Sequence, residues 1–156
     1  MTAVLSLGSN LGDRAGHLAV AREILGAVFP VVGVSPIYET APVGFVDQAA
    51  FLNQILLLDA SDPEELLSAA HRAEEARGRV RNRRWGPRTL DVDVISVDAL
   101  RLDSPRLTLP HPRAHERAFV LLPWLDVDPD AEVPGRGAVL GLLRRLDTAD
   151  VRRWAA

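Results

Sequence analysis

The sequence has 156 residues, which is the size of one ordinary domain. Hydrophobic residues make up 47% of it and charged residues 25%, a balance typical of a globular protein and not of a disordered one. Cysteine is absent, which excludes disulfides, thiolate metal sites and a cysteine nucleophile. No apolar run approaches the ~20 residues of a membrane span, and Met1–Leu5 lacks the basic region of a secretion signal. We therefore expect a single cytoplasmic domain over residues 1–156, with no membrane partner.

The basic residues are all of one kind. Every one of the 18 is arginine, which excludes a Schiff-base lysine enzyme and a P-loop. Any bound anion must then be held by guanidinium groups, which are planar, always charged and suited to bidentate contact with phosphate. The net charge of -3 argues against a general nucleic-acid binder. Six arginines nevertheless gather in twelve residues that contain no Asp or Glu: Arg77, Arg79, Arg81, Arg83, Arg84 and Arg88.

Hydrophobic spacing and turn residues predict six elements over the first 97 residues. The clearest signal is a helix start, where Asp62 is a good N-cap, Pro63 takes the first helical position and Glu65 completes a capping box. In chain order the expected elements are a strand over Thr2–Leu7, a helix with apolar residues Leu18, Ala21, Leu25 and Val28, strands over Val31–Tyr38 and Phe51–Leu58, a helix from Pro63 to Gly78, and a strand over Thr89–Val97.

The order strand, helix, strand, strand, helix, strand is typical of a ferredoxin-like α+β sandwich, an antiparallel sheet with both helices on one face. Pro36 places the second strand at an edge or a bulge, and Thr40–Gly44 and Arg79–Arg88 are predicted loops. The remaining chain forms a C-terminal extension. Its predicted pieces are strand-like segments at Leu100–Leu102 and Leu107–Leu109, a loop or short helix over Pro110–Arg117, an apolar stretch over Ala118–Leu125 and a last helix around Val139–Leu146.

Two carboxylates on the strand before residue 97 are the first candidate for chemistry. Residues two apart on a strand share a face, so Asp91 and Asp93 project together, about 6–7 Å apart at the backbone, while Leu90, Val92 and Val94 face the core. The pair is either a solvated strand face or a site for a hard cation such as Mg²⁺. The arginines just before it favour the second interpretation, because acids that hold metal beside guanidiniums that hold anion suit a metal–polyphosphate substrate.

The segment from residue 110 to 117 offers two histidines and two arginines. A zinc site from His111 and His115 is conceivable, but Pro112 disfavours helical geometry between them and no further ligands are evident. Contact with phosphate, or capping of the local backbone, is the favoured interpretation of His111 and Arg117.

The loop Thr40–Gly44, together with Phe51 and Asn53, has two interpretations. It is either structural only, or a pocket for a flat polar heterocycle in which the ring of Phe51 stacks and the amide of Asn53 reads the edge. Similarly, Trp85 either stacks on a ring or anchors its loop in the core.

Several of these segments resemble one known family. Arg84–Ile95 resembles the signature of 6-hydroxymethyl-7,8-dihydropterin pyrophosphokinases. Further matching segments, in order, are Leu7–Gly12, Tyr38–Gly44, Phe51–Asn53, Gly78–Arg81, Pro110–Arg113 and Glu116–Val120. The resemblance spans nearly the whole chain. It implies the ferredoxin-like fold and transfer of the β,γ-pyrophosphoryl group of ATP to the pterin hydroxymethyl oxygen, with release of AMP, in folate biosynthesis.

The resemblance also implies the site residues. Asp91 and Asp93 would hold two Mg²⁺ ions on the triphosphate, and with Arg81 and Arg84 they are the expected catalytic groups. The expected ATP-binding residues are Glu74, Arg79, Arg81, Arg84, Trp85, Arg88, His111 and Arg117. The expected pterin-binding residues are Thr40, Pro42, Val43, Phe51, Asn53, Trp85, Asp91 and Phe119, with Phe51 and Phe119 stacked on the two faces of the ring. ATP and the pterin are the expected partners of a monomer.

Two alternatives remain open at this point. One is another Mg-dependent, nucleotide-using transferase with a different acceptor. The other is a non-catalytic RNA-binding ferredoxin-like module, which needs exposed aromatic residues on its sheet; aromatic residues make up only 5% of this chain. No residue stands out as a general base. Asp93 could accept the hydroxyl proton, but a metal ligand is a poor base.

Overall fold

The structure is a computed structural model that describes residues 1–41, 49–78 and 89–155. Its centre is an antiparallel sheet, which in the described part of the chain has six strands in the order β10-β3-β4-β1-β5, with β2 also paired to β4. The bounds of these strands are Thr2–Ser9 for β1, Val31–Val34 for β2, Tyr38–Thr40 for β3, Phe51–Asp59 for β4, Asp91–Val97 for β5 and Val151–Arg153 for β10. Leaving β10 aside, this is the predicted ferredoxin-like order.

The predicted strand over Val31–Tyr38 is divided in two. Strand β2 covers its first four residues, whereas β3 begins at its last residue and continues to Thr40; both strands pair with successive parts of the same neighbour, β4. Pro36 lies between them, and proline cannot donate to a sheet ladder. The hydroxyl of Ser35 instead accepts a hydrogen bond of 2.9 Å from the backbone N–H of Ile55. The break therefore leaves the local backbone partnered while the strand changes direction.

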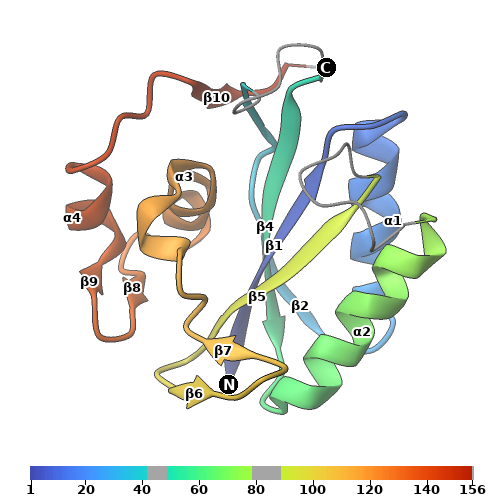
Figure 1. Ribbon diagram of the computed structural model, residues 1–156, viewed down its shortest axis with the longest axis horizontal. Helices are drawn as coiled ribbons and strands as arrows, with labels where there is room; N and C mark the ends of the chain where they lie inside the picture. The colour runs from blue at the N-terminus through green and yellow to red at the C-terminus, as the bar shows by residue number, and fades with distance from the viewer. Residues whose placement is uncertain (42–48, 79–88, 156) are drawn as a thin grey trace.

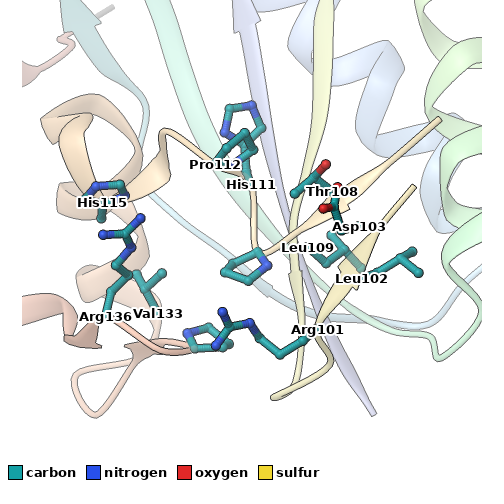
Figure 2. Close-up of a pocket in the computed structure, with 12 residues that line it drawn as sticks. Arg101, Leu102, Asp103, Thr108, Leu109, His111, Pro112, His115, Val133 and Arg136 are labelled. Carbon is teal, nitrogen blue, oxygen red and sulfur yellow. The ribbon is translucent and has the colours of Figure 1, made fainter. Parts of the chain in front are cut away.

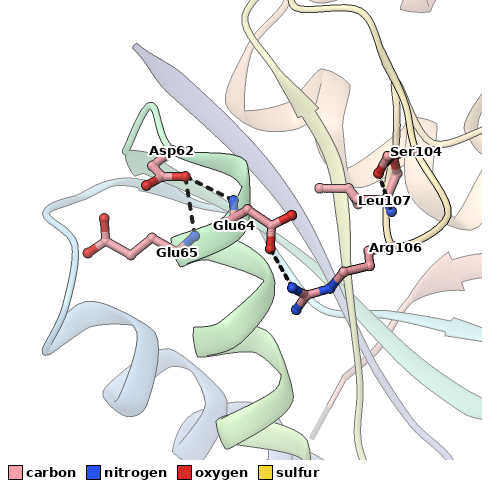
Figure 3. A network of polar contacts seen from close by, with 6 residues as sticks. All are labelled: Asp62, Glu64, Glu65, Ser104, Arg106 and Leu107. Carbon is pink, nitrogen blue, oxygen red and sulfur yellow. Dashed lines mark hydrogen bonds and ion pairs between the residues drawn. The ribbon is translucent and has the colours of Figure 1, made fainter.

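Helices α1 (Arg14–Gly26) and α2 (Pro63–Ala76) cover one face of the sheet, as predicted (Figure 1). The carboxylate of Asp62 accepts hydrogen bonds from the backbone N–H groups of Glu64 and Glu65, which confirms the predicted cap (Figure 3). Gly78 follows the end of α2 with a φ of 74°, a left-handed conformation that favours glycine. Large apolar side chains of both helices and of the sheet form the core between them, with Leu5, Leu18, Leu25, Leu56 and Leu66 fully buried.

The opposite face of the sheet is covered by the C-terminal extension. Helix α3 (Ala118–Val127) packs on that face, and α4 (Val139–Leu143) packs on α3 (Figure 1). Trp124 lies in this second core cluster with Ile55 and Ile95 of the sheet. The apolar stretch predicted over Ala118–Leu125 is therefore a helix that closes the second face.

The rest of the extension consists of short pieces. Its hairpins are β6 (Leu102–Asp103) with β7 (Thr108–Leu109), and β8 (Glu132–Val133) with β9 (Gly137–Ala138), and the 3₁₀ turn η1 spans Ala114–Glu116. Arg106 in the first hairpin forms an ion pair of 3.0 Å with Glu64, so the hairpin is tied to the start of α2 (Figure 3). The second hairpin and strand β10 have no counterpart among the predicted elements.

Strand β10 adds to the free edge of β3. Arg153 lies opposite Tyr38, and Val151 lies opposite Thr40. The Tyr38 hydroxyl donates a hydrogen bond to the carboxylate of Asp126 in α3, which Arg153 also contacts at 3.2 Å. Burial raises the pKa of Tyr38, so the phenol stays a donor. The chain end, β3 and α3 are thus joined at one point. Among the described helices, none is long and apolar enough to cross a membrane.

Candidate active site

The carboxylates of Asp91 and Asp93 lie on one face of β5. Helix α3 packs on the same face of the sheet, at another part of it. Asp91 is opposite Gly8, and Asp93 is opposite Ser6, on the central strand β1. Between them Val92 is only 5% exposed and belongs to the core beneath α1 and α2. Both carboxylates are half-buried. The predicted same-face placement of the two carboxylates is confirmed.

Glu74 holds the edge strand β5 at Val92, the residue between the two aspartates. Its side chain is 3% exposed, and its Oε2 accepts a hydrogen bond of 3.0 Å from the backbone N–H of Val92. Among the described residues β5 pairs only with β1, on one side, so this N–H takes its partner from outside the sheet. In the structure Glu74 anchors the strand that carries both acids, and its predicted contact with ATP stays a prediction.

A β-bulge in β5 positions His111. The register of β1 with β5 shifts between Val4 and Leu5, so that Ile95 is one extra residue in the ladder. The carbonyl oxygen of Ile95 accepts a hydrogen bond of 2.8 Å from the backbone N–H of His111. Burial, followed by the charges of Arg117 and Arg113, lowers the pKa of His111 to about 4. The imidazole is therefore neutral at pH 7, in surroundings whose positive charge would favour an anion.

Arg117 connects the acidic pair to helix α3. It precedes the first residue of α3, and burial lowers its pKa while the carboxylates of Asp93 and Asp91 act in the opposite direction. Its guanidinium carbon is 5.7 Å from the centre of the Phe119 ring, within the range of a cation–π contact. The structure thus brings together Arg117, Phe119 and the acids of β5.

A row of residues across the sheet leads from the acids to the predicted pterin side. Asp91, Gly8, Asn53 and Tyr38 lie opposite one another on successive strands. Asn53 is 3% exposed, and its Nδ2 donates a hydrogen bond of 2.7 Å to the hydroxyl of Thr40. This bond orients the amide, so that its Oδ1 is presented as an acceptor.

Gly8 keeps open the space above this row. A Cβ at this position would lie 3.4 Å from Oδ1 of Asn53 and 3.7 Å from Cδ1 of Phe51. Any side chain would therefore occupy the space between the amide and the aromatic ring. The sequence reasoning missed Gly8 as a site residue; the available signal was a glycine at the end of a buried strand, directly before the turn residues Ser9 and Asn10.

The remaining predicted site residues lie outside the described residues. These are Pro42, Val43, Arg79, Arg81, Arg84, Trp85 and Arg88. Thr40 of β3 and Thr89, just before β5, are the described residues closest to them in the sequence that also lie next to site residues in the chain or across the sheet.

The donor set fits magnesium better than a protein-enclosed metal. Among the described residues no group of three or more His, Cys, Asp or Glu side chains could hold a metal ion, so the zinc alternative for His111 and His115 gains no further ligand. Asp91 and Asp93 supply two carboxylates on one face. This suits Mg²⁺, which takes one or two carboxylates and completes its shell with water and phosphate oxygens.

Comparison with known proteins shows which family has this sequence. Residues 4–129 match the family model of 7,8-dihydro-6-hydroxymethylpterin-pyrophosphokinase. The chain belongs to this family. Relatives named 2-amino-4-hydroxy-6-hydroxymethyldihydropteridine pyrophosphokinase include those of Mycobacterium tuberculosis (47% identical, covering 94% of this chain and 85% of the relative), Methylorubrum extorquens (43%, covering 97% of both) and Bacillus subtilis (40%, covering 97% and 89%).

Solved structures support the fold of this pyrophosphokinase family member. The wild-type HPPK-DHPS of Plasmodium falciparum with pteroate has a TM-score of 0.70 at 16% identity, over 92% of this chain and 42% of that one. This chain therefore spans less than half of that protein, and at this identity the likeness concerns the fold alone. It agrees with the predicted ferredoxin-like sandwich. The RNA-binding alternative gains no support from these matches, because the matched family and the named relatives are pyrophosphokinases.

Proposed function

We propose that this protein transfers pyrophosphate from ATP to 6-hydroxymethyl-7,8-dihydropterin, giving AMP and the pterin diphosphate, in folate biosynthesis. One observation carries the proposal: Asp91 lies in the same row as Asn53, with the side-chain-free Gly8 between them. A group suited to metal-bound phosphate and a group suited to the edge of a heterocycle are thereby held on β5 and β4, on the two sides of β1. Family membership supports the same reaction.

On the nucleotide side, Asp91 and Asp93 would hold two Mg²⁺ ions, which neutralise charge on the triphosphate when bound. Arg117, whose charge interacts with those of both acids, and His111, which feels the charge of Arg117, would favour the phosphate oxygens through charge and hydrogen bonding. The proposed ATP contacts further include Glu74 and, from the sequence alone, Arg79, Arg81, Arg84, Trp85 and Arg88.

On the pterin side, Phe51 and Phe119 would stack on the two faces of the ring. Oδ1 of Asn53 would accept from the ring N–H groups, with its amide oriented by Thr40. The proposed pterin contacts from the sequence alone are Pro42, Val43 and Trp85. Asp91, at the end of the row, lies where the hydroxymethyl group would approach the phosphates.

The reaction itself needs little covalent help from the protein. The pterin hydroxyl oxygen forms a bond to the β-phosphorus, the bond from that phosphorus to the bridging oxygen of AMP breaks, and the hydroxyl proton is lost. Positioning and charge stabilisation supply most of the rate in such transfers. The sheet row fixes the position, and Arg117, with Arg81 and Arg84 as further proposed catalytic groups, meets the developing negative charge. We also propose that the enzyme acts as a single-domain monomer in the cytoplasm.

An AMP assay tests the function directly. We expect AMP to form from ATP only when both Mg²⁺ and the hydroxymethyl pterin are present, in equal amounts with the pterin diphosphate. AMP formation that is independent of the pterin would favour the alternative of a transferase with another acceptor. Binding of RNA that weakens with salt, without any turnover, would favour the non-catalytic module.

A further inference from the structure

A cavity lies among the hairpins of the C-terminal extension. His111 of the candidate site is one of the residues that line it. Its volume is about 420 Å³, within the usual size of small-molecule sites. Segments far apart in the sequence form it: the β5–β6 connection and β6, the end of β7, η1 and the β8–β9 hairpin. Figure 2 shows Arg101 and Arg136 entering the cavity from separate segments, with Arg136 reaching toward His115.

The charges around this cavity are unbalanced. Within the described part of the chain, neither Arg101 nor Arg136 makes an ion pair, although Asp103 also lines the cavity. Arginines elsewhere in the same extension do have carboxylate partners, as Arg153 has with Asp126 and Arg106 has with Glu64. Two unpaired guanidiniums facing one hollow leave it suited to an anion.

The Arg101 side chain passes close to the backbone of Gly135. Gly135 has a φ of 75°, and a methyl group there would overlap the Arg101 guanidinium, which lies directly over the glycine backbone. A side chain at this position would therefore displace the end of the arginine. Gly135 therefore acts on the cavity through Arg101.

Part of the remaining wall is apolar, although Asp103, Thr108, His111 and His115 also line the cavity. The apolar part consists of Leu102, Leu109, Val133 and the prolines Pro110, Pro112 and Pro134. A wall of this kind favours burial of a hydrocarbon or aromatic surface, while the arginines at its rim pair with a carboxylate or phosphate. A bare inorganic ion would leave the apolar wall unused.

We propose that this cavity is a second binding site, separate from the ATP and pterin positions, for a small organic anion with an apolar or aromatic body. Arg101 and Arg136 pair with its charge, and the leucine, valine and proline wall packs against its body. The cavity shares His111 with the proposed ATP contacts, but its arginines, Arg101 and Arg136, are not among the residues assigned to the proposed reaction.

The test is calorimetric titration of the full chain with phenyl phosphate and with benzoate. The protein is first saturated with Mg²⁺ and a non-hydrolysable methylene analogue of ATP, so that the proposed nucleotide position is filled. We expect one equivalent of either anion to bind. Arg101→Ala and Arg136→Ala should each weaken binding about tenfold, as expected for loss of a charge-assisted pair. Gly135→Ala should weaken it without changing any charge. Arg144→Ala, an exposed arginine outside the cavity, should leave binding unchanged.

Several outcomes would overturn the site. These are loss of binding when the nucleotide analogue is present, equal binding by the wild type and both arginine variants, or binding of inorganic phosphate as tight as that of phenyl phosphate. Both arginines are exposed and without ion pairs in the described part of the chain, so their variants should fold normally. Unchanged thermal midpoints check this. The comparison of benzoate with phenyl phosphate shows which anion chemistry the cavity prefers.

Discussion

The hydrogen bond from Asn53 to Thr40 decides which end of a buried amide faces the candidate pterin position. Thr40→Val keeps the shape and the strand preference of this residue but removes the acceptor. We expect the pterin KM to rise about fivefold, as for the loss of about 1 kcal/mol of net hydrogen bonding, with the ATP KM unchanged. Steady-state kinetics with each substrate varied measures this. Thr2→Val, at the opposite end of the sheet, is the matched control, and an equal rise in both KM values would contradict the assignment.

The carboxylates of Asp91 and Asp93 can be tested by removing charge without removing volume. Asp91→Asn and Asp93→Asn should each reduce kcat at least about a thousandfold, since metal-held charge stabilisation contributes several kcal/mol. Both side chains are half-buried on a strand face, so the free energy of unfolding should change little. AMP formation at saturating Mg²⁺ measures the effect. Turnover near the wild-type rate in either variant would remove the residue from the site.

His111 should make stability depend on pH. Its pKa in the folded protein is about 4, below its usual 6.5, so the unfolded chain binds the additional proton between these values. The free energy of unfolding should therefore fall as the pH drops from 6.5 towards 4 and then level off, by about 1–2 kcal/mol after allowance for solvent screening. Urea unfolding of wild type and His111→Asn at several pH values isolates this contribution as their difference.

The same imidazole reports on the nucleotide. A triphosphate beside His111 would oppose the effect of the two arginines, so ATP should raise its pKa. The ring proton resonance, assigned with His111→Asn, can be followed through a pH titration with and without ATP. An unchanged pKa would place the triphosphate away from His111.

For single residues, the sequence predicts which side chains belong to the candidate site better than it predicts their hydrogen bonds and orientations. The spacing of Asp91 and Asp93 predicted their shared face, because strand geometry alone sets it. The amide orientation of Asn53 could not be predicted, since it depends on Thr40 across a strand pair. The role of Gly8 could not be predicted, because it depends on the space that a missing side chain leaves. That space is defined only once the neighbouring strands are placed beside it.

Among the elements, strand β5 depends on helix α2 for its outer edge. Glu74→Ala removes the acceptor of the buried Val92 N–H and should lower the free energy of unfolding by about 1–3 kcal/mol. It should also lower kcat, because the two acids flank the unanchored residue. Glu74→Gln retains a carbonyl acceptor and should recover most of the stability. Urea unfolding and kcat are measured together; full stability in the alanine variant would show that this hydrogen bond does not secure the strand.

Element prediction succeeded where local chemistry decides the structure. The N-cap at Asp62 follows from a single residue and its immediate neighbours, whereas Pro36 predicted an edge or bulge and the structure has a break there. The bulge at Ile95 does not follow from its immediate neighbours, because nothing in the alternation of β5 marks an extra residue; it arises from pairing with β1 and from the hydrogen bond to His111. Strand β10 was missed for a similar reason, since three residues have too little pattern to predict a strand without its partner.

For the molecule as a whole, the C-terminal segment braces the pterin side through β3. Removal of residues 150–156 deletes β10 and with it the Arg153 contact to Tyr38 and Asp126. We expect a lower thermal midpoint and a pterin Kd that rises more than the ATP Kd, because β3 carries Thr40. Calorimetry with both ligands decides this. The double variant Arg144→Ala, Arg145→Ala is a control that alters the same region outside the strand. An equal loss for both ligands would make β10 a general support only.

The sheet row has a practical consequence for redesign. Backbone ladders join Asp91 to Gly8 and Gly8 to Asn53, so the span between the proposed metal-binding position and the proposed pterin-binding position is set by the main chain. Side chains facing the acceptor can then be exchanged one at a time without altering that span. A library aimed at a new acceptor alcohol should therefore vary Thr40, Phe51 and Phe119 and leave β1 untouched. Variants from such a library should change acceptor preference while retaining their affinity for Mg-ATP.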